Sequence, residues 1–213
     1  MWRGVFATLA VLATGFGIDR LAAAAGWTQA VHLAWLGLAA VLVGWMAWSL
    51  ELARAEAATD GLTGAPNRRA FLAAADERLR RARRRGRPLT VVYIDVDDFK
   101  HVNDTLGHAV GDRVLRCVAR TLRQTLREDD LFARLGGDEF VVLLDSGRPS
   151  PLVARLHNAL RRQSAAWGLD VRFSLGAVTF PRVPDSAEDM LRRGDAAMYE
   201  AKEQGDRVVH RMA

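Results

Sequence analysis

Two groups of carboxylates stand where the sequence otherwise predicts buried β-strands. The first includes Asp95, which ends the apolar run 89–94, and the second is Asp138-Glu139, directly after a glycine pair. Clustered carboxylates repel one another and are costly to remove from water, so they bind a cation or take up protons. Mg²⁺ suits such a site because it takes one or two carboxylates and completes its shell with phosphate oxygens and water. A Mg²⁺–nucleotide site is therefore one hypothesis, and solvated acids at the tip of a turn are the alternative.

The elements that must position these acids are a strand and a hairpin. The run 89–97 is almost continuously apolar, as in a central strand. Residues 131–135 and 140–144 predict a β-hairpin whose Gly-Gly turn suits positive φ values. If the hairpin lies beside the central strand, as a small mixed sheet favours, Asp95 and Asp138 converge at one edge of the sheet. The phosphate-binding pattern GxxxxGK followed by Ser or Thr is absent from the sequence, so another device must hold nucleotide phosphates.

Helices and further strands complete one predicted domain that starts near Asp60. Hydrophobic residues at helical spacing predict one helix after Asn67, with Phe71, Leu72, Ala75, Leu79 and Ala82 inside, and a second after Gly111, with Val114, Leu115, Val118, Leu122 and Leu126 inside. Helix, strand, helix and strand are then expected at 151–166, 171–179, 187–204 and 207–211. This order predicts an α/β (α+β) fold with a mixed sheet covered by helices.

Composition and charge exclude several classes of protein. The formal net charge of +5, from 30 basic and 25 acidic residues, is mild for 213 residues, and no nucleic-acid partner is expected. The lone Cys117 excludes an intrachain disulfide, and it falls on the stripe of Val114 and Val118, so a buried core position is expected. Seven arginines within 78–87 predict a solvated basic helix end, with contact to anionic lipid as the alternative.

The N-terminal segment is apolar enough to enter a membrane. Residues 21–50 contain no Asp, Glu, Lys or Arg, and a span needs about 20 such residues, so a transmembrane helix is predicted at about 31–50. A shorter uncharged stretch predicts a first span at about 4–21, which favours an uncleaved helical hairpin over a cleaved signal peptide. Arginines flank the pair on both outer sides, so the soluble part is expected in the cytosol, at the inner (cytoplasmic) membrane of the cell. The predicted organisation is a membrane anchor at 1–50 that contacts lipid, a short helical stalk at 51–59 and a soluble domain at 60–213.

Five ordered motifs connect the acids to a known family. They are DGLTGAPNRR (60–69), IDVDDFKHVNDTLGHAVGD (94–112), RLGGDEF (134–140), SLGA (174–177) and DAAMYEAK (195–202). On these motifs the sequence resembles the diguanylate cyclases, the GGDEF domains, over about residues 59–209. The resemblance implies a fold related to the palm of nucleotidyl cyclases and polymerases. It also implies the condensation of two GTP molecules into cyclic di-GMP by a homodimer with one GTP in each subunit.

The resemblance assigns roles to the clustered acids. Asp95 and Asp138 match the family's ligands for Mg²⁺ or Mn²⁺, assisted by the backbone carbonyl of Val96. Glu139 matches an essential acid that serves in metal binding or proton handling. The resemblance therefore implies that Asp138 and Glu139 are catalytic.

Contacts with GTP are implied for seven residues. They comprise walls of the base pocket (Leu62 and Leu115), guanine readers (Asn103 and Asp112) and phosphate contacts (Lys202, with the backbone N–H groups of Phe99 and Lys100). The chemistry agrees for Asp112, because guanine N1–H and the N2 amino group are adjacent donors suited to a carboxylate. Taken alone, Asn103 and Asp112 would be interpreted as a loop turn and a helix cap. Arg134 and Asp60 match a structural ion pair of the family.

A further charged segment precedes the predicted hairpin. Arg127 and Asp130 form an RxxD pair, which taken alone would be solvated surface. In the family such a pair often forms an inhibitory product site, and Arg155 is a candidate second arginine. Arg can hold a phosphate or a guanine edge in a bidentate grip, and Asp can accept from guanine N1–H and N2. Non-competitive inhibition by cyclic di-GMP is therefore expected.

Two departures from the family pattern leave an alternative function open. Ala65 replaces a usual leucine, and Asp206 follows Gly205 where a basic residue usually helps to hold phosphate. Because an acid there would repel the triphosphate, the alternative is a catalytically weak or inactive GGDEF domain that acts as a membrane-bound receptor for GTP or cyclic di-GMP. A cyclase for ATP is opposed by Asp112, which adenine would leave unpaired. The active cyclase is the favoured interpretation because every implied acid and guanine reader is present.

Overall fold

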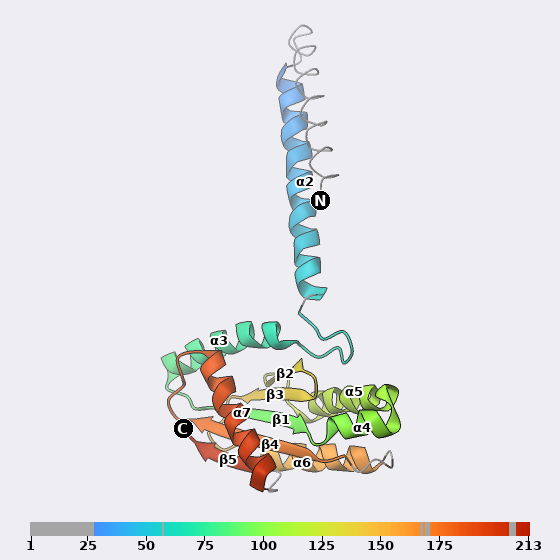
Figure 1. The fold of residues 1–213 in the computed structure, drawn as a ribbon. Helices are drawn as coiled ribbons and strands as arrows, with labels where there is room; N and C mark the ends of the chain where they lie inside the picture. The colour runs from blue at the N-terminus through green and yellow to red at the C-terminus, as the bar shows by residue number, and fades with distance from the viewer. Residues whose placement is uncertain (1–27, 57, 167, 169–170, 205–207) are drawn as a thin grey trace. The chain divides into compact units, whose positions relative to one another are not determined.

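The computed structural model describes residues 28–56, 58–166, 168, 171–204 and 208–213 (Figure 1). The chain divides into two units, residues 1–56 and residues 57–213. The first unit contains the helix α2 (Thr28–Glu56). The second contains, in chain order, α3 (Arg68–Arg85), β1 (Leu89–Val96), α4 (Phe99–Leu106), α5 (His108–Thr125), β2 (Leu131–Gly136), β3 (Glu139–Leu144), α6 (Ser150–Ala165), β4 (Phe173–Phe180), α7 (Ala187–Gln204) and β5 (Val208–Met212).

Five strands of the second unit form one mixed sheet in the order β2-β3-β1-β4-β5. β1 is antiparallel to both of its neighbours, β3 and β4, whereas β5 runs parallel to β4. All eight residues of β1 and all eight of β4 are buried. The centre of the sheet is therefore covered on both faces, which explains why the sequence of β1 is almost continuously apolar. The predicted mixed sheet and the predicted adjacency of the hairpin to the central strand are confirmed.

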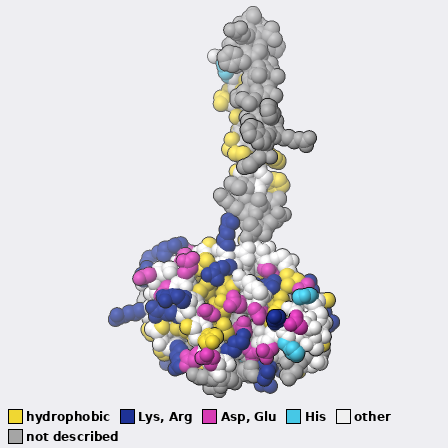
Figure 2. All heavy atoms as spheres, viewed as in Figure 1, with side chains coloured by type: hydrophobic (Ala, Val, Ile, Leu, Met, Phe, Trp, Pro, Cys, Tyr) yellow, Lys and Arg dark blue, Asp and Glu magenta, His cyan; other side chains and the backbone are white. Residues whose placement is uncertain are grey.

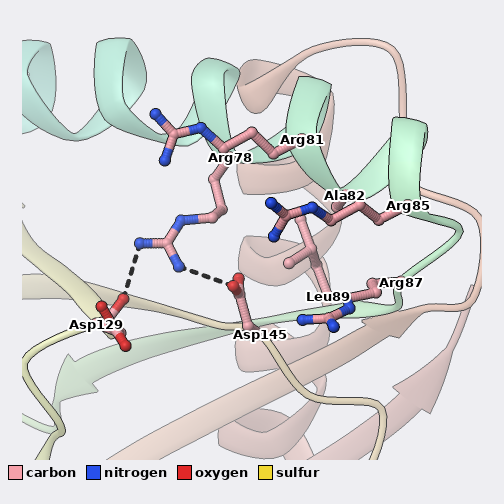
Figure 3. A pocket seen from close by; sticks show the side chains of 8 residues that line it. All are labelled: Arg78, Arg81, Ala82, Arg85, Arg87, Leu89, Asp129 and Asp145. Atoms are coloured by element: carbon pink, nitrogen blue, oxygen red, sulfur yellow. Dashed lines mark hydrogen bonds and ion pairs between the residues drawn. The ribbon is translucent and has the colours of Figure 1, made fainter.

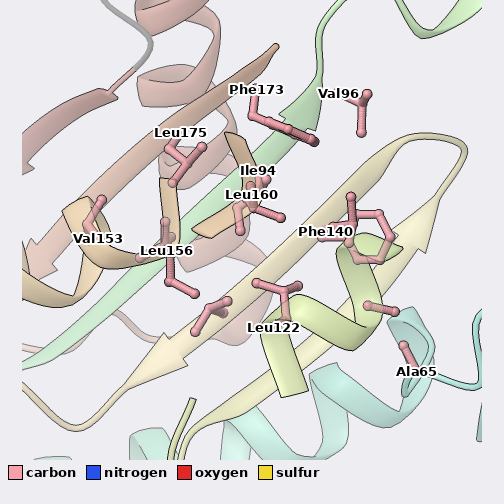
Figure 4. Close-up of a cluster of buried hydrophobic side chains, with 14 of the residues drawn as sticks. Ala65, Ile94, Val96, Leu122, Phe140, Val153, Leu156, Leu160, Phe173 and Leu175 are labelled. Atoms are coloured by element: carbon pink, nitrogen blue, oxygen red, sulfur yellow. The ribbon is translucent and has the colours of Figure 1, made fainter. Parts of the chain in front are cut away.

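Hydrophobic side chains pack on both faces of this sheet. One cluster joins the sheet to α5 and α6 and includes Ile94, Leu122, Phe140, Leu156 and Leu175 (Figure 4). The other joins the sheet to α3 and α7 and includes Phe71, Tyr93, Val141, Met190 and Met198. Successive residues of β1 enter opposite clusters because side chains alternate along a strand. The register of β1 therefore also determines which face receives its one acid, Asp95.

Local sequence signals set the ends of α3. The side-chain oxygen of Asn67 accepts a hydrogen bond of 3.0 Å from the backbone N–H of Ala70, so Asn67 caps the helix. Gly86 ends the helix in the left-handed conformation, with φ of 59°. Four of the predicted inner residues of α3 are buried, namely Phe71, Ala75, Leu79 and Ala82, whereas Leu72 is only partly buried. Cys117 of α5 is buried as expected.

The segment between β1 and β2 differs from the prediction. A short helix, α4, precedes α5, and α5 itself begins at His108 rather than after Gly111. α4 is only eight residues long and carries no fully buried residue. Phe99 and Val102 pack partly against the core, so its hydrophobic period is too short to identify a helix. Gly107, with φ of 84°, separates the two helices. The predicted inner face of α5 is otherwise confirmed, since Val114, Leu115, Val118 and Leu122 are buried and Leu126 packs against the same cluster.

α2 forms the described part of the first unit. It is long and apolar enough to cross a membrane over Gln29–Ser49, a stretch of 21 residues. The helix continues without a break to Glu56, so the predicted stalk is helical over 51–56. Described side chains on α2 are mostly hydrophobic, whereas acidic and basic side chains are interspersed over the second unit (Figure 2). Of the two predicted spans, the described residues contain one candidate, and the other, at about 4–21, lies outside them.

Candidate active site

The clustered acids meet at the end of β1. Asp95 and Glu139 are partners in the antiparallel register of β1 and β3. Asp138 lies in the hairpin turn, next to Gly137, whose φ of 49° is in the left-handed region that favours glycine. The turn therefore delivers two adjacent carboxylates beside Asp95, as the predicted strand pairing requires.

A lysine from α7 reaches the same point. Lys202 Nζ donates to Asp95 Oδ2 at 2.6 Å. α7 can lie close to the sheet because Gly176 of β4 has no side chain: a Cβ there would be 2.0 Å from the backbone nitrogen of Met198. Lys202 follows Met198 by one helical turn, so the close contact at Gly176 helps to place the ammonium over Asp95.

Burial and mutual repulsion perturb these acids. Burial raises the pKa of Asp95 above its ordinary value and the negative charge of Asp138 adds to this rise, against the opposing hydrogen bond from Lys202. Burial also raises the pKa of Glu139, as do the neighbouring acids, although a hydrogen bond from Tyr93 opposes them. Negative charge is therefore in excess here, and the site favours a cation.

The donor set fits a divalent ion that is shared with a substrate. Asp95 and Asp138 offer carboxylates, and β1 ends at Val96, the residue whose carbonyl the sequence suggests as a third ligand. Across the parts of the chain that the structure describes, no group of three or more His, Cys, Asp or Glu side chains could hold a metal unaided. Such a set suits Mg²⁺, which binds through one or two carboxylates and takes its other ligands from phosphates and water.

Two further acids support the end of β1 and were not assigned a role from the sequence. Asp97 is buried and accepts a hydrogen bond of 2.6 Å from the hydroxyl of Ser174. Asp98 takes a left-handed conformation, with φ of 54°, which is uncommon for a residue other than glycine. These two residues turn the chain sharply from β1 into α4. The SLGA motif marks Ser174 as a residue of interest, but the spacing of the motifs does not show that Ser174 pairs with Asp97.

One predicted guanine reader lies against a glycine. Asn103 of α4 packs over Gly111 of α5 so tightly that a Cβ at Gly111 would lie 1.9 Å from Asn103 Oδ1 and 3.1 Å from Phe99 Cζ. The glycine therefore determines where the amide of Asn103 can sit. The other predicted reader, Asp112, follows Gly111 directly and forms an ion pair of 3.4 Å with Arg116. The structure thus brings Asn103 and Asp112 to one junction between α4 and α5.

The remaining predicted GTP contacts differ in burial. Leu115 is 2% exposed, so it belongs to the core, and Leu62 is partly buried against the same cluster. Phe99 also packs partly on that cluster, whereas the side chain of Lys100 is exposed. The apolar residues therefore form the floor of this region, and the basic Lys202 forms an ion pair with Asp95, an acid of the site.

The predicted ion pair between Asp60 and Arg134 is confirmed. Arg134 Nη1 lies 2.8 Å from Asp60 Oδ1, and Arg134 Nη2 donates to the carbonyl of Gly137 at 2.6 Å. Asp60 also accepts from the hydroxyl and the backbone N–H of Thr63. Arg134 thus connects the first motif to the turn before Glu139 that contains Asp138.

Arg127 and Asp130, the RxxD residues, line a cavity of about 290 Å³ together with Arg155. The turn is closed by hydrogen bonds in both directions, from Arg127 N to Asp130 Oδ2 at 3.0 Å and from Asp130 N to the carbonyl of Arg127 at 3.1 Å. Arg155 donates to the carbonyl of Thr125 at 2.8 Å, which holds α6 beside the end of α5. The structure therefore brings together the three residues that were singled out as a product site, and Arg148 lines the same cavity.

A third feature is an arginine-lined cavity of about 280 Å³ beside the end of α3 (Figure 3). Its arginines are Arg78, Arg81, Arg85 and Arg87. Within the same arginine run, Arg80 and Arg81 pair with Glu77, and Arg83 with Asp185. These arginines remain exposed, so the predicted solvated basic helix end is confirmed, although some of its members pair within the domain.

Comparison with known proteins agrees with this site. A family described as "Diguanylate cyclase, GGDEF domain" matches residues 57–207. Diguanylate cyclase TpbB of Pseudomonas aeruginosa is 40% identical over 152 residues, which are 68% of this chain and 35% of that protein. Diguanylate cyclase DgcP of the same species is 38% identical over 164 residues, 73% of this chain and 24% of that protein. The chain therefore spans about a quarter to a third of the length of these two relatives.

A solved structure has the same fold. The coiled coil and GGDEF domain of DgcB from Caulobacter crescentus, crystallised in complex with cyclic di-GMP, has a TM-score of 0.70 and 29% identity. The match covers 83% of this chain and 97% of that one. The motifs, the sheet with its acids at the end of β1, and the family match over residues 57–207 together show that this chain belongs to the diguanylate cyclase, GGDEF domain family.

Proposed function

We propose that the chain is a membrane-anchored diguanylate cyclase that condenses two GTP molecules into cyclic di-GMP and two pyrophosphates. The observation that carries the proposal is the meeting of Asp95, Asp138 and Glu139 at the end of β1, with Lys202 bonded to Asp95 at 2.6 Å. Excess negative charge beside one lysine suits a metal-bound triphosphate, because the metal satisfies the acids and the lysine attracts the phosphates.

Each residue has a role in this proposal. Asp95 and Asp138 hold Mg²⁺ or Mn²⁺, with the carbonyl of Val96 as a further ligand, and Glu139 binds metal or handles a proton. When bound, the ion lowers the pKa of the attacking 3′-hydroxyl and offsets the charge that develops on the phosphates. Lys202 transfers its contact from Asp95 to a phosphate oxygen, which balances the charge that the substrate brings.

Guanine is read at the junction of α4 and α5. Asn103 and Asp112 offer an amide and a carboxylate to the N1–H and N2 edge, while Leu62 and Leu115 form the apolar floor. The backbone N–H groups of Phe99 and Lys100, at the start of α4, serve the phosphates because the first N–H groups of a helix have no partner within it.

The reaction requires two domains. One set of motifs per chain provides one GTP site, whereas the product joins two nucleotides, so we propose a homodimer in which each 3′-hydroxyl attacks the other's α-phosphate. The dimer contributes alignment, which can account for a large share of the rate enhancement. Product bound at Arg127, Asp130 and Arg155 inhibits non-competitively by keeping the two GTP sites apart.

The proposed location is the inner membrane, with the domain in the cytosol. The support is α2, whose Gln29–Ser49 stretch is long and apolar enough to span a bilayer and would contact lipid there. A glycosylation- or protease-accessibility map of the full chain in cells tests this arrangement. Access to the 60–213 segment from the outer side would contradict it.

The deciding experiment is incubation of the purified full chain with GTP and Mg²⁺, followed by identification of the product by mass. Cyclic di-GMP is expected, and Asp138→Ala serves as the negative control. GTP binding without any product would instead favour the receptor function, for which the acidic Asp206 is the supporting observation. Asp206 lies outside the described residues.

A further inference from the structure

Arg78 of α3 connects two cavities whose residues lie far apart in the sequence. Its Nη1 donates to Asp145 Oδ2 at 2.8 Å, and its Nη2 donates to the carbonyl of Asp129 at 2.9 Å (Figure 3). Asp129 lies inside the Arg127–Asp130 turn, and Asp145 directly follows β3. One guanidinium thus holds together the end of β3 and the turn that carries the RxxD pair.

Asp145 is the shared wall of the two cavities. It lines both the arginine-lined cavity and the RxxD cavity of about 290 Å³. The RxxD cavity is where the proposed product site lies, and cyclic di-GMP carries two phosphodiester charges. A free carboxylate on that wall would repel them, because like charges that are partly shielded from water interact more strongly than in bulk solvent.

Arg78 is placed to cancel this charge. Its side chain is 19% exposed and that of Asp145 is 45% exposed, so the pair is partly shielded from solvent. Because Arg78 Nη1 and Nη2 donate in fixed directions, one guanidinium neutralises the carboxylate and holds the turn at the same time. Arg80 of the same helix, in contrast, donates to Glu77 on α3 itself.

We propose that Arg78 is a positioning residue of the product site, which neutralises Asp145 and fixes the carbonyl of Asp129 so that the cavity accepts the phosphates of cyclic di-GMP. The inference rests on the proposed product site at Arg127, Asp130 and Arg155. It adds a residue that contacts no ligand and determines how tightly the product is held.

The test is calorimetric titration of cyclic di-GMP into the purified full chain at low and at high salt. Arg78→Ala should weaken binding about fivefold at low salt, the size expected for one partly exposed charge pair, and the defect should shrink at high salt. Arg78→Gln, a long neutral side chain that retains donors, should show the same salt-dependent loss if the alanine variant does not fold. Arg80→Ala is the matched control, because it removes an arginine from the same helix and should bind product like the wild type.

Asp145→Asn separates charge from mechanical support. The amide can still accept from Arg78 but carries no charge, so product should bind as tightly as in the wild type or more tightly. The double variant Arg78→Ala/Asp145→Asn should recover most of the affinity lost in Arg78→Ala. A merely structural brace would instead leave the double variant as weak as Arg78→Ala, because Asp145→Asn cannot restore the hydrogen bonds that Arg78 makes.

Arg127→Ala distinguishes the two levels of the proposal. If Arg127→Ala binds product like the wild type, the product site itself is wrong, and the inference falls with it. If Arg127→Ala loses binding while both Arg78 variants keep it, or while the double variant recovers nothing, the product site stands and the role of Arg78 is overturned.

Discussion

Gly111→Ala is expected to weaken GTP binding while leaving the domain folded. The added Cβ would lie 1.9 Å from Asn103 Oδ1, and ordinary contact begins at 3.4 Å, so the amide oxygen must move by about 1.5 Å. The Asn103 side chain can rotate away because its end is flexible. However, a hydrogen bond of 2.7–3.2 Å does not survive a displacement of that size.

The expected loss follows from one misplaced amide. Leaving a guanine donor or acceptor without its partner costs about 2 kcal/mol, which corresponds to about a 30-fold rise in KM for GTP. Stability should not fall in parallel, because replacing glycine by alanine inside a helix contributes up to about 1 kcal/mol. Gly111→Ala should therefore separate folding from substrate recognition.

Steady-state kinetics with GTP and thermal melting of the same preparations test this reasoning. Asn103→Ala is the matched comparison, and the double variant should be no worse than either single variant, because Gly111→Ala acts through Asn103. If Gly111→Ala and Asn103→Ala both have a KM for GTP close to that of the wild type, Asn103 does not read guanine. Additive losses would show that Gly111 acts by another route.

Four further predictions concern Asp138, Gly176, Asp60 and the association of two chains. Asp138→Ala should reduce cyclic di-GMP formation at least about 1000-fold with little change in melting temperature, because it removes a carboxylate from an exposed turn; retained turnover would contradict the metal assignment. Gly176→Ala should destabilise the fold by about 3 kcal/mol or more in chemical denaturation, because its Cβ would meet the backbone of Met198 at 2.0 Å, whereas Gly61→Ala, with nothing within 4 Å, is the control. Burial opposes the charge of Asp60, but bonds from Thr63 and Arg134 hold the pKa of Asp60 below its ordinary value, so its stabilising contribution is present above that value and is lost as the pH falls through the lowered one. Below about pH 4 the unfolding free energy of Asp60→Asn should therefore fall less steeply than that of the wild type, and parallel curves would contradict the ion pair's contribution. Activity per mole of chain should rise with protein concentration, with the mass measured alongside, whereas a constant value across a range in which the mass changes from monomer to dimer would exclude half-sites on separate chains.

Much of the fold can be predicted from residue patterns because the pattern and the packing have the same cause. β1 and β4 are mostly apolar because both of their faces are covered, and the stripe on α3 follows from its contact with one face of the sheet. α4 was not predicted because it is only eight residues long, so its partly buried Phe99 and Val102 make too short a hydrophobic period. The start of α5 was misplaced because Gly111, which looks like a helix breaker, lies within the helix.

The candidate site was predictable only in part. The proximity of Asp95 and Asp138 was predictable because it requires only that two apolar segments, β1 and β3, pair as neighbouring strands. Contacts such as Arg78 with Asp145, or Ser174 with Asp97, join residues 67 and 77 positions apart, and no local period encodes them. Such contacts depend on the three-dimensional course of the chain, and they are where the structure adds most to the sequence.

The glycines of the site show why its geometry tolerates so little change. Gly137 lets the hairpin turn carry two acids, Gly176 lets α7 bring Lys202 to Asp95, and Gly111 lets Asn103 settle at the junction of α4 and α5. Each glycine serves a different functional group, and each does so by the absence of a Cβ rather than by a contact of its own. Substitutions at the three positions should therefore fail differently: at Gly137 through backbone strain, at Gly176 through loss of stability, and at Gly111 through loss of GTP affinity in a folded protein.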